Sequence, residues 1–324
     1  MSDVLLIVPN ILAAEEFNGC LLVPHQNQWP MMSDLPRDFQ TSDYACVAAT
    51  AATDADSVRQ MLAALANEQA TDRRIVFAED AMPAGLRAAM PEPLCSLLQR
   101  PQPRDLMCIS TKVVQASTAS DSFCATVLRG NFAATWLPVQ PRIDRFPQAG
   151  PPRKKFASGL TSAMLTSAVD RTLAGVKISH SERKCITAGI LLLWDFLDES
   201  HEISQTMEGR GNPRTADYWH GIMHRREPDA GNAAYWFRRV GSHPAFDLLA
   251  SNLVRWMLET GASEEECLFV TQKLIANGSF DPFALVELST QALRKPGHVE
   301  DTTLRRIQYL EILNLLAWSI AATN

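Results

Sequence analysis

The stretch DYWHGIMHRREPDAGNAAYWFRRVGSHPAF, residues 217–246, decides how the second half of the chain folds. Its polar and aromatic side chains recur every three or four residues, which is helical spacing. Pro228 interrupts the pattern because proline cannot continue a helix interior. We therefore expect two helices, over 214–227 and 230–240, joined by a tight turn. The same stretch holds three of the seven histidines of the chain and four arginines. The segment that predicts the fold therefore also concentrates polar side chains.

The helical pattern extends on both sides of this stretch, from about residue 157 to the end of the chain. Ser181 with Glu182 is a helix-start signal, and the acidic run 263–266 suits the first turn of a helix, where the helix dipole favours negative charge. The predicted helices are 158–176, 181–206, 214–227, 230–240, 244–260, 263–276, 282–294 and 301–321. We expect residues 157–324 to form an all-α domain.

Residues 1–137 have a different pattern, in which short apolar runs alternate with polar segments. The predicted strands are 4–8, 45–50, 75–78, 106–110 and 123–128, and a helix is expected over 54–70. Neither GxGxxG nor GxxxxGK[ST] occurs, so no nucleotide-binding fingerprint is present. This part is expected to be a small mixed α/β domain.

The stretch 138–156 separates these two parts. It contains five prolines and a short basic cluster, so it can continue neither a helix nor a central strand. We interpret it as a linker. The fold class expected for the whole chain is α+β, mostly α, with a smaller mixed α/β N-terminal part and an all-α C-terminal helical domain.

Composition restricts the partners and the compartment. The net charge of −6 gives no general basic face for nucleic acid. The apolar run 186–194 is too short to cross a membrane, and no secretory signal precedes the first strand. The seven cysteines include no CxxC pair, which favours a reducing cytoplasmic compartment. We expect a small-molecule ligand rather than nucleic acid or a membrane, and a homo-oligomer is left open.

Polar residues occupy the spacing at which a packed helix usually has an apolar stripe. Residues three or four apart lie on one helical face, so three successive predicted helices each have a polar stripe. The three sets are Trp194, Asp198, His201 and Gln205; Asp217, His220, His224 and Glu227; and Asn232, Trp236 and Arg239 with His243, which follows just past the glycine after the third helix.

These stripes have three interpretations. They could face solvent, although tryptophan and histidine are unusual choices for a solvent-facing surface. They could form a buried network in which the polar groups satisfy one another. They could instead converge on a pocket that binds a ligand.

A metal site is the sharpest form of the pocket interpretation. His220 and His224 are four residues apart on one face, which is the spacing at which two imidazoles can bind one ion. Glu227 could add a carboxylate oxygen or act as a base, and the shell could be completed by His201, His243 or Asp198. Such a donor set suits one divalent zinc, iron or manganese ion. The pair lacks the glutamate of the HExxH protease motif.

The arginines and aromatic residues are candidates for substrate binding. Arginine binds carboxylate or phosphate through paired hydrogen bonds, and aromatic faces stack on sugars or flat ligands. The candidates are Trp194, Arg225, Arg226, Asn232, Trp236 and Arg239. Internal ion pairs with Asp217, Glu227 or Asp229 are the alternative for the arginines.

Two blocks of the sequence resemble the motif of a family of bacterial and fungal proteins that has no established activity. LLWDFLDESHEISQ (192–205) is similar to its WDxLDxSHxxSQ helix, and residues 217–246 are similar to its YWHxxxHRREPDxxNxxYWxRRVGxHP block. The resemblance covers about residues 190–246 and implies no function. It implies that the motif positions are occupied by Asp198, His201, His220, His224, Arg225, Arg226, Glu227, Asn232, Trp236, Arg239 and His243.

Two functions follow from these patterns. The first is a metal-dependent hydrolase or lyase that acts on a small anionic or sugar-like molecule. In an alternative mechanism that uses no metal, Asp198 would orient His201 as a general base. The second is a non-catalytic ligand-binding or assembly protein that uses the same tryptophan, arginine and histidine surface.

Overall fold

The structure, a computed structural model, describes residues 4–9, 20–25, 44–47, 74–77, 82–98, 107–110, 133–136, 161–211, 213–294 and 299–321. By its internal contacts the chain divides into two compact units. The sheet unit comprises Met1–Ala81, Pro91–Gln140 and Phe156–Ala174, and the helical unit comprises Met82–Met90, Pro141–Lys155 and Gly175–Asn324. The described residues are mostly helical, as the sequence predicts. The predicted linker 138–156, helix 54–70 and strand 123–128 lie outside the described residues.

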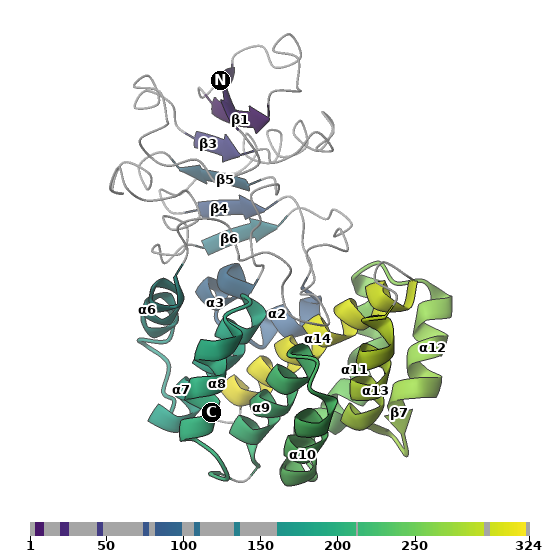
Figure 1. The fold of residues 1–324 in the computed structure, drawn as a ribbon. Helices are drawn as coiled ribbons and strands as arrows, with labels where there is room; N and C mark the ends of the chain where they lie inside the picture. The colour runs from purple at the N-terminus through teal and green to yellow at the C-terminus, as the bar shows by residue number, and fades with distance from the viewer. Residues whose placement is uncertain are drawn as a thin grey trace. The chain divides into compact units, whose positions relative to one another are not determined.

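The sheet unit contains a mixed six-stranded sheet with the order β2-β1-β3-β5-β4-β6 (Figure 1). Its strands are β1 (Val4–Pro9), β2 (Cys20–His25), β3 (Tyr44–Val47), β4 (Arg74–Phe77), β5 (Met107–Ser110) and β6 (Ala133–Trp136). Parallel pairs join β1 to β2, β1 to β3 and β4 to β6, whereas β5 runs antiparallel to both of its neighbours. Four predicted strands correspond to β1, β3, β4 and β5, while β2 and β6 were not predicted. The unit also holds α3 (Glu92–Leu98) and α6 (Ser162–Thr172).

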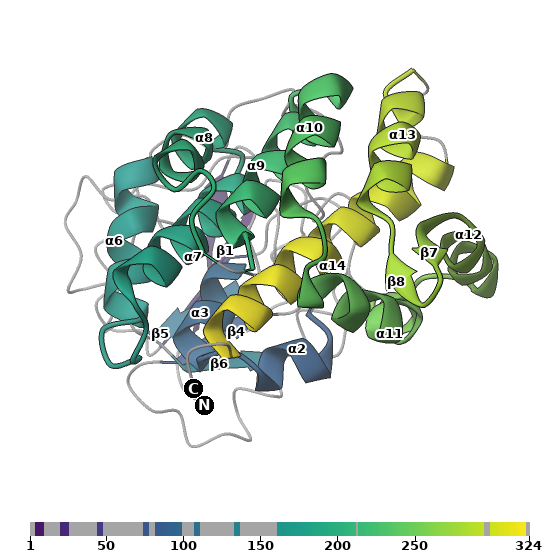
Figure 2. The ribbon, with the colours of Figure 1, turned by 90° about the horizontal axis from the view of Figure 1, so that it is seen from below.

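The helical unit is built around α14, the last helix. Its helices are α2 (Ala84–Ala88), α7 (His180–Leu193), α8 (Leu197–Thr206), α9 (Thr215–Arg226), α10 (Ala230–Val240), α11 (Pro244–Glu259), α12 (Glu264–Leu274), α13 (Pro282–Ala292) and α14 (Val299–Ala321). A two-stranded hairpin, β7 (Ile275–Ala276) and β8 (Ser279–Phe280), follows α12. Helix α14 packs against α7, α11 and α13, and Figure 2 shows it crossing between them.

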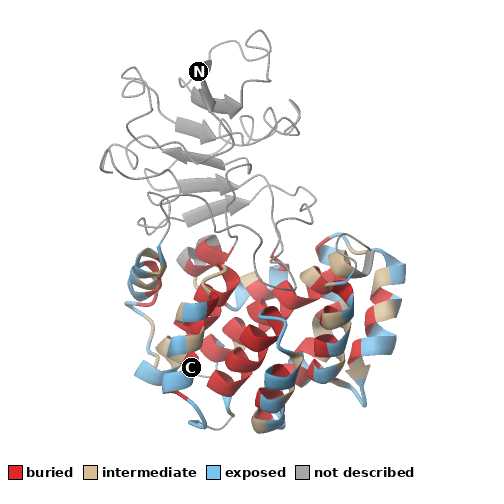
Figure 3. Ribbon diagram, in the orientation of Figure 1, coloured by how far each residue is buried: buried red, intermediate tan, exposed pale blue. Residues whose placement is uncertain are grey.

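Burial of apolar side chains explains the central position of α14. Leu304, Ile307, Leu310, Ile312 and Leu315, which predicted a buried closing helix, are all inaccessible to solvent. Burying a side chain of this size contributes about 1.5–3 kcal/mol. Figure 3 shows the buried residues concentrated in the middle of the helical unit. Within the described part of the chain, no helix combines the length and apolar character needed to cross a membrane.

The predicted helix 181–206 is wrong in one respect, because the structure divides it into α7 and α8. The chain turns at Asp195, whose φ of 67° lies in the left-handed region. Arg226 of α9 stabilises this turn by donating hydrogen bonds to the Leu192 carbonyl and to the Asp195 carboxylate. Trp194 is therefore the C-cap of α7 and does not share a helix with the polar residues of α8.

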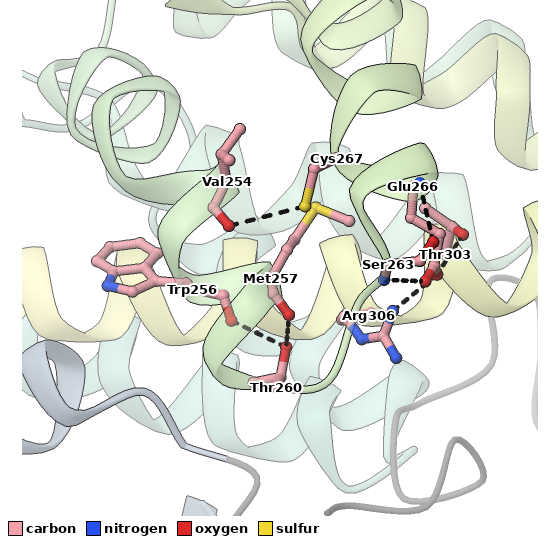
Figure 4. A network of polar contacts seen from close by, with 9 residues as sticks. All are labelled: Val254, Trp256, Met257, Thr260, Ser263, Glu266, Cys267, Thr303 and Arg306. Carbon is pink, nitrogen blue, oxygen red and sulfur yellow. Dashed lines mark hydrogen bonds and ion pairs between the residues drawn. The ribbon is translucent and has the colours of Figure 1, made fainter.

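Helix starts depend on capping side chains, and in α7 the cap lies two residues earlier than the sequence signal suggests. Ser179, not Ser181, caps α7, and its hydroxyl and the Glu182 carboxylate form a capping box. Ser263 and Glu266 form the same arrangement in α12. Figure 4 shows that the Glu266 carboxylate also accepts hydrogen bonds from Thr303 and Arg306 of α14. The acidic first turn of α12 thus fastens this helix to the central one.

Two glycines let α9 approach its neighbours closely. A Cβ at Gly189 of α7 would lie 2.6 Å from the Trp219 ring, and a Cβ at Gly221 of α9 would lie 2.9 Å from the Phe237 ring of α10. Only hydrogen at these positions leaves room for the aromatic rings. Helix α9 is therefore held against both α7 and α10, with its polar stripe inside the unit.

Candidate metal centre

Three imidazoles meet where α8 lies against α9. His220 and His224 project from one face of α9, and His201 comes from α8. One possible ligand atom from each residue lies within 4.8 Å of the others. The ring centres of His201 are 4.6 Å from His220 and 5.3 Å from His224. The structure thus brings together three of the four histidines that the sequence offers as metal ligands.

His220 is the most enclosed member of the cluster, with 1% of its surface exposed. The Trp236 indole of α10 stacks on it at 3.7 Å and 12°, and the His224 ring stacks on it at 5.1 Å and 9°. Among the described residues neither ring nitrogen of His220 has a hydrogen-bond partner. A buried polar atom left unpaired costs about 1–3 kcal/mol, which a bound ion or an ordered water would offset.

The protonation states favour cation binding, because a metal coordinates neutral imidazole. Burial, reinforced by His201 and His224, lowers the pKa of His220 to about 3. Burial also lowers the pKa of His224, although the Glu227 carboxylate opposes the shift. Neither ring therefore has to lose a proton to accept an ion near neutral pH.

Glu227 orients His224. Its Oε2 lies 3.0 Å from His224 Nδ1, which leaves Nε2 of that ring as the donor for an ion. A carboxylate in this position fixes the tautomer of a ligating histidine and increases its basicity. The Glu227 side chain is 38% exposed, so it reaches solvent beside the cluster.

The three nitrogens lie at a spacing that a small adjustment would make suitable for a transition metal. Imidazole nitrogens at about 2.0–2.1 Å from a tetrahedral zinc ion are roughly 3.4 Å apart. The donor atoms here lie within 4.8 Å, so rotations of the rings would have to close a gap of about 1.4 Å. Three protein ligands leave a fourth position open, which is the arrangement of catalytic rather than structural zinc sites. His201 is only partly buried, so the cluster borders solvent at this residue.

The structure does not bring His243 into this cluster. His243 is the N-cap of α11, where its Nδ1 accepts a hydrogen bond from the Ala245 amide at 3.1 Å. Its Nε2 lies 3.2 Å from the Thr215 hydroxyl. Both nitrogens are therefore engaged in fixing helices.

Asp198 is also not placed to orient His201 or to join the histidine cluster. It is exposed in the first turn of α8, and the described residues contain no hydrogen bond between it and His201. In this position the carboxylate complements the helix dipole. The alternative mechanism without metal, in which Asp198 orients His201, is therefore supported by no contact among the described residues.

Arg225 and Arg226 are used inside the helical unit. Arg225 makes a two-pronged ion pair with the buried Glu311 of α14, and Tyr218 donates a hydrogen bond to the same carboxylate. Arg226 is bound to the turn at Asp195, as described above. For these two residues the buried-network interpretation fits better than substrate binding, since little of either guanidinium group remains for a ligand.

The other substrate-binding candidates have different positions: one caps a helix, one packs in the core, and two lie at the histidine cluster. Asn232 donates to Asp229 at the start of α10, and Trp194 is fully buried. Trp236 covers His220 rather than an open surface. Arg239 lies 5.0 Å above the Trp236 ring and is held by Glu208 at 3.1 Å and Asp217 at 3.6 Å. Its side chain is 29% exposed, so it can still meet an anion from solvent.

Sequence reasoning missed the partner of Arg225. Glu311 lies in the apolar run of α14, where the predicted closing helix was read for its leucines and isoleucines alone. The charged residue among them, together with Gln308 and Asn314 three residues away on either side, was a signal of an internal polar network. The partner itself, 86 residues away in the chain, carried no local signal.

The chain matches no family model, no curated protein and no solved structure with which it was compared. The resemblance of residues 190–246 to a motif family therefore stays a prediction, and the site is interpreted from its own chemistry.

Proposed function

We propose that the helical unit binds one divalent zinc, iron or manganese ion through His201, His220 and His224, and that the protein is a metal-dependent hydrolase or lyase. The observation that carries the proposal is the environment of His220. Both of its nitrogens are buried without a partner among the described residues, and two further imidazoles lie within reach. An ion bonded to one of these nitrogens would offset the cost of burying it.

The chemistry of such a site is activation of water. A divalent ion lowers the pKa of a bound water and thereby supplies hydroxide near neutral pH. Glu227 borders the cluster and is partly exposed, so it could accept a proton from that water or from the substrate. Arg239 would orient an anionic group, since its partner Glu208 is exposed and can be displaced at little cost. The substrate class that fits is a small anionic or sugar-like molecule.

Metal binding is tested by titrating chelator-treated protein with zinc against a chromophoric chelator. We expect one equivalent to bind, and His220→Gln, which is similar in size, to weaken binding at least 100-fold. Glu227→Gln should weaken it 10- to 100-fold, because the carboxylate acts through His224. His180→Gln is the matched control, since His180 is exposed at the start of α7 and lies outside the cluster.

Two results would contradict the metal site. One is the absence of stoichiometric zinc, iron or manganese under any of these conditions. The other is equal affinity in the His220→Gln, Glu227→Gln and His180→Gln proteins, each shown to be folded by circular dichroism.

Catalysis is tested separately with zinc-loaded protein and 4-nitrophenyl esters, phosphates and glycosides. We expect hydrolysis that disappears in chelator and in His220→Gln, and a raised KM for anionic substrates in Arg239→Gln. Zinc binding without metal-dependent turnover on any substrate would replace this proposal by the non-catalytic ligand-binding or assembly role. We place the activity in the reducing cytoplasm, which suits the buried free thiols of Cys185 and Cys267.

A further inference from the structure

The helical unit contains a cavity of about 360 Å³ that is separate from the histidine cluster. Four segments line it: the first turns of α7, the connection between α8 and α9, the start of α9 and the end of α14. Its lining includes Glu182, Cys185, Met207, Arg210, Thr215 and Trp318. None of the three clustered histidines contributes to its wall. Its volume is within the range of small-molecule sites.

Hydrogen bonds fix the walls of this cavity. The capping box of Ser179 and Glu182 holds the α7 wall. The α8–α9 connection turns through Gly209 and Gly211, whose φ values of 65° and 83° suit glycine, and the Gly209 amide donates to Asp217 at 2.9 Å. Thr215 on the opposite side is bonded to His243. A ligand therefore meets a preformed site and loses little affinity to ordering it.

Part of the cavity wall is apolar. Trp318 is partly exposed toward solvent, and its ring is held edge-on to His243 at 4.6 Å. Met207 and Cys185 are buried beside it. Burial, with a smaller effect of Glu182, raises the pKa of the Cys185 thiol to about 12. Cys185 is therefore a neutral apolar surface and not a nucleophile.

The charge at the rim selects the ligand. Arg210 is exposed, and the described part of the chain offers its guanidinium no hydrogen-bond or ion-pair partner. Glu182, the acidic lining residue, keeps its negative charge while it accepts the Ser179 amide, so Arg210 is the charged lining residue that can attract an anion. A free guanidinium beside an apolar cavity matches a molecule with a carboxylate at one end and an aromatic or aliphatic body at the other.

We infer that this cavity binds a small apolar monocarboxylate, whose carboxylate pairs with Arg210 and whose apolar body lies against Trp318, Met207 and Cys185. The site is independent of the metal centre, because it shares no residue with it. It is also independent of the reaction proposed for that centre.

The inference is tested by saturation-transfer NMR with 3-phenylpropionate as the probe and 3-phenylpropan-1-ol and 3-phenylpropan-1-amine as matched analogues. The protein is first treated with chelator and desalted, so that no ion at the histidine cluster can hold the carboxylate. We expect millimolar binding of the carboxylate and at least tenfold weaker binding of the alcohol and the amine. Arg210→Gln should weaken carboxylate binding about tenfold and leave the alcohol unchanged.

Two variants locate the binding. Arg238→Gln removes an exposed arginine of α10 that does not line the cavity, so it should bind the probe as the unaltered protein does. Ser181→Phe fills the cavity from an exposed lining position and should abolish binding of both the carboxylate and the alcohol. The inference is overturned if no probe binds at 10 mM, if the amine binds as well as the carboxylate, or if Arg210→Gln and Arg238→Gln have equal effects.

Discussion

Arg225 and Glu311 are both fully buried, and their ion pair shows that α9 also has buried polar side chains outside its histidine stripe. Burial of two charges costs several kcal/mol for each ion, which the pair recovers through its two-pronged geometry and the hydrogen bond from Tyr218. Helix α9 therefore serves two purposes: its arginines hold α14 and α7, while its histidines form the cluster.

Removing either partner of this pair should be severely destabilising. Arg225→Met or Glu311→Gln alone leaves one buried charge unpaired, so we expect each to lower the free energy of unfolding by about 3–5 kcal/mol. The double variant removes both charges and keeps a carbonyl that can accept from Tyr218. Its free energy of unfolding should therefore fall by several kcal/mol less than the sum of the decreases in the two single variants. Urea denaturation of all four proteins measures this, and strict additivity would show that the two charges do not depend on each other.

At the scale of elements, the sequence predicted most helices close to their observed bounds. Helices α9, α10 and α11 were predicted well because caps and proline act locally, within a turn of the residue that causes them. The break between α7 and α8 was not predictable in this way. It depends on Arg226, which binds the Asp195 turn from 31 residues further along the chain.

The candidate site was likewise predictable only where it depends on residues that are close in the sequence. The pairing of His220 with His224 follows from helical spacing alone, and His201 was one of several candidates for a third ligand. Choosing His201 over His243 required the packing of α8 on α9, which no local pattern encodes. The cavity beside Trp318 was not predicted, because its lining comes from three stretches that are separated in the sequence, within 179–185, 207–216 and 318–319.

Helix packing around the cluster can be tested at Gly189. Alanine there would place a Cβ 2.6 Å from the buried Trp219 ring, so α7 and α9 would have to separate. We expect Gly189→Ala to lower the free energy of unfolding by about 1–3 kcal/mol. Gly175→Ala is the matched control, because nothing lies within 4 Å of its added Cβ. Equal stability of the two variants in urea denaturation would show that the close approach of α7 and α9 is not required.

At the scale of the whole molecule, His243 joins three helices of the helical unit. It caps α11, bonds to Thr215 at the start of α9 and lies edge-on to Trp318 of α14. Its Nδ1 acts as an acceptor for a backbone amide, and a protonated imidazole cannot accept. Proton uptake at this one residue should therefore loosen the contacts of three helices together.

This position predicts acid sensitivity of the fold. Burial lowers the pKa of His243 from 6.5 to about 4, so between these two pH values the unfolded chain binds a proton that the folded chain does not. The stability contributed by neutral His243 is complete above pH 6.5. It is lost as the pH falls through this window, by about 3 kcal/mol in total, and the loss levels off below pH 4.

Asparagine at this position isolates the effect of His243. His243→Asn keeps a side-chain acceptor for the Ala245 amide but cannot be protonated. Urea denaturation of chelator-treated protein from pH 4.5 to 7.5 should therefore show no difference in slope above pH 6.5. Below pH 6.5 the loss of stability should be shallower for the variant, by about 1.4 kcal/mol per pH unit. The other buried histidines titrate in both proteins, so their contribution cancels in the difference. If both proteins lose stability with the same slope, His243 does not set the acid limit of the helical unit, and its hydrogen bonds to α9 and α11 contribute equally in both protonation states.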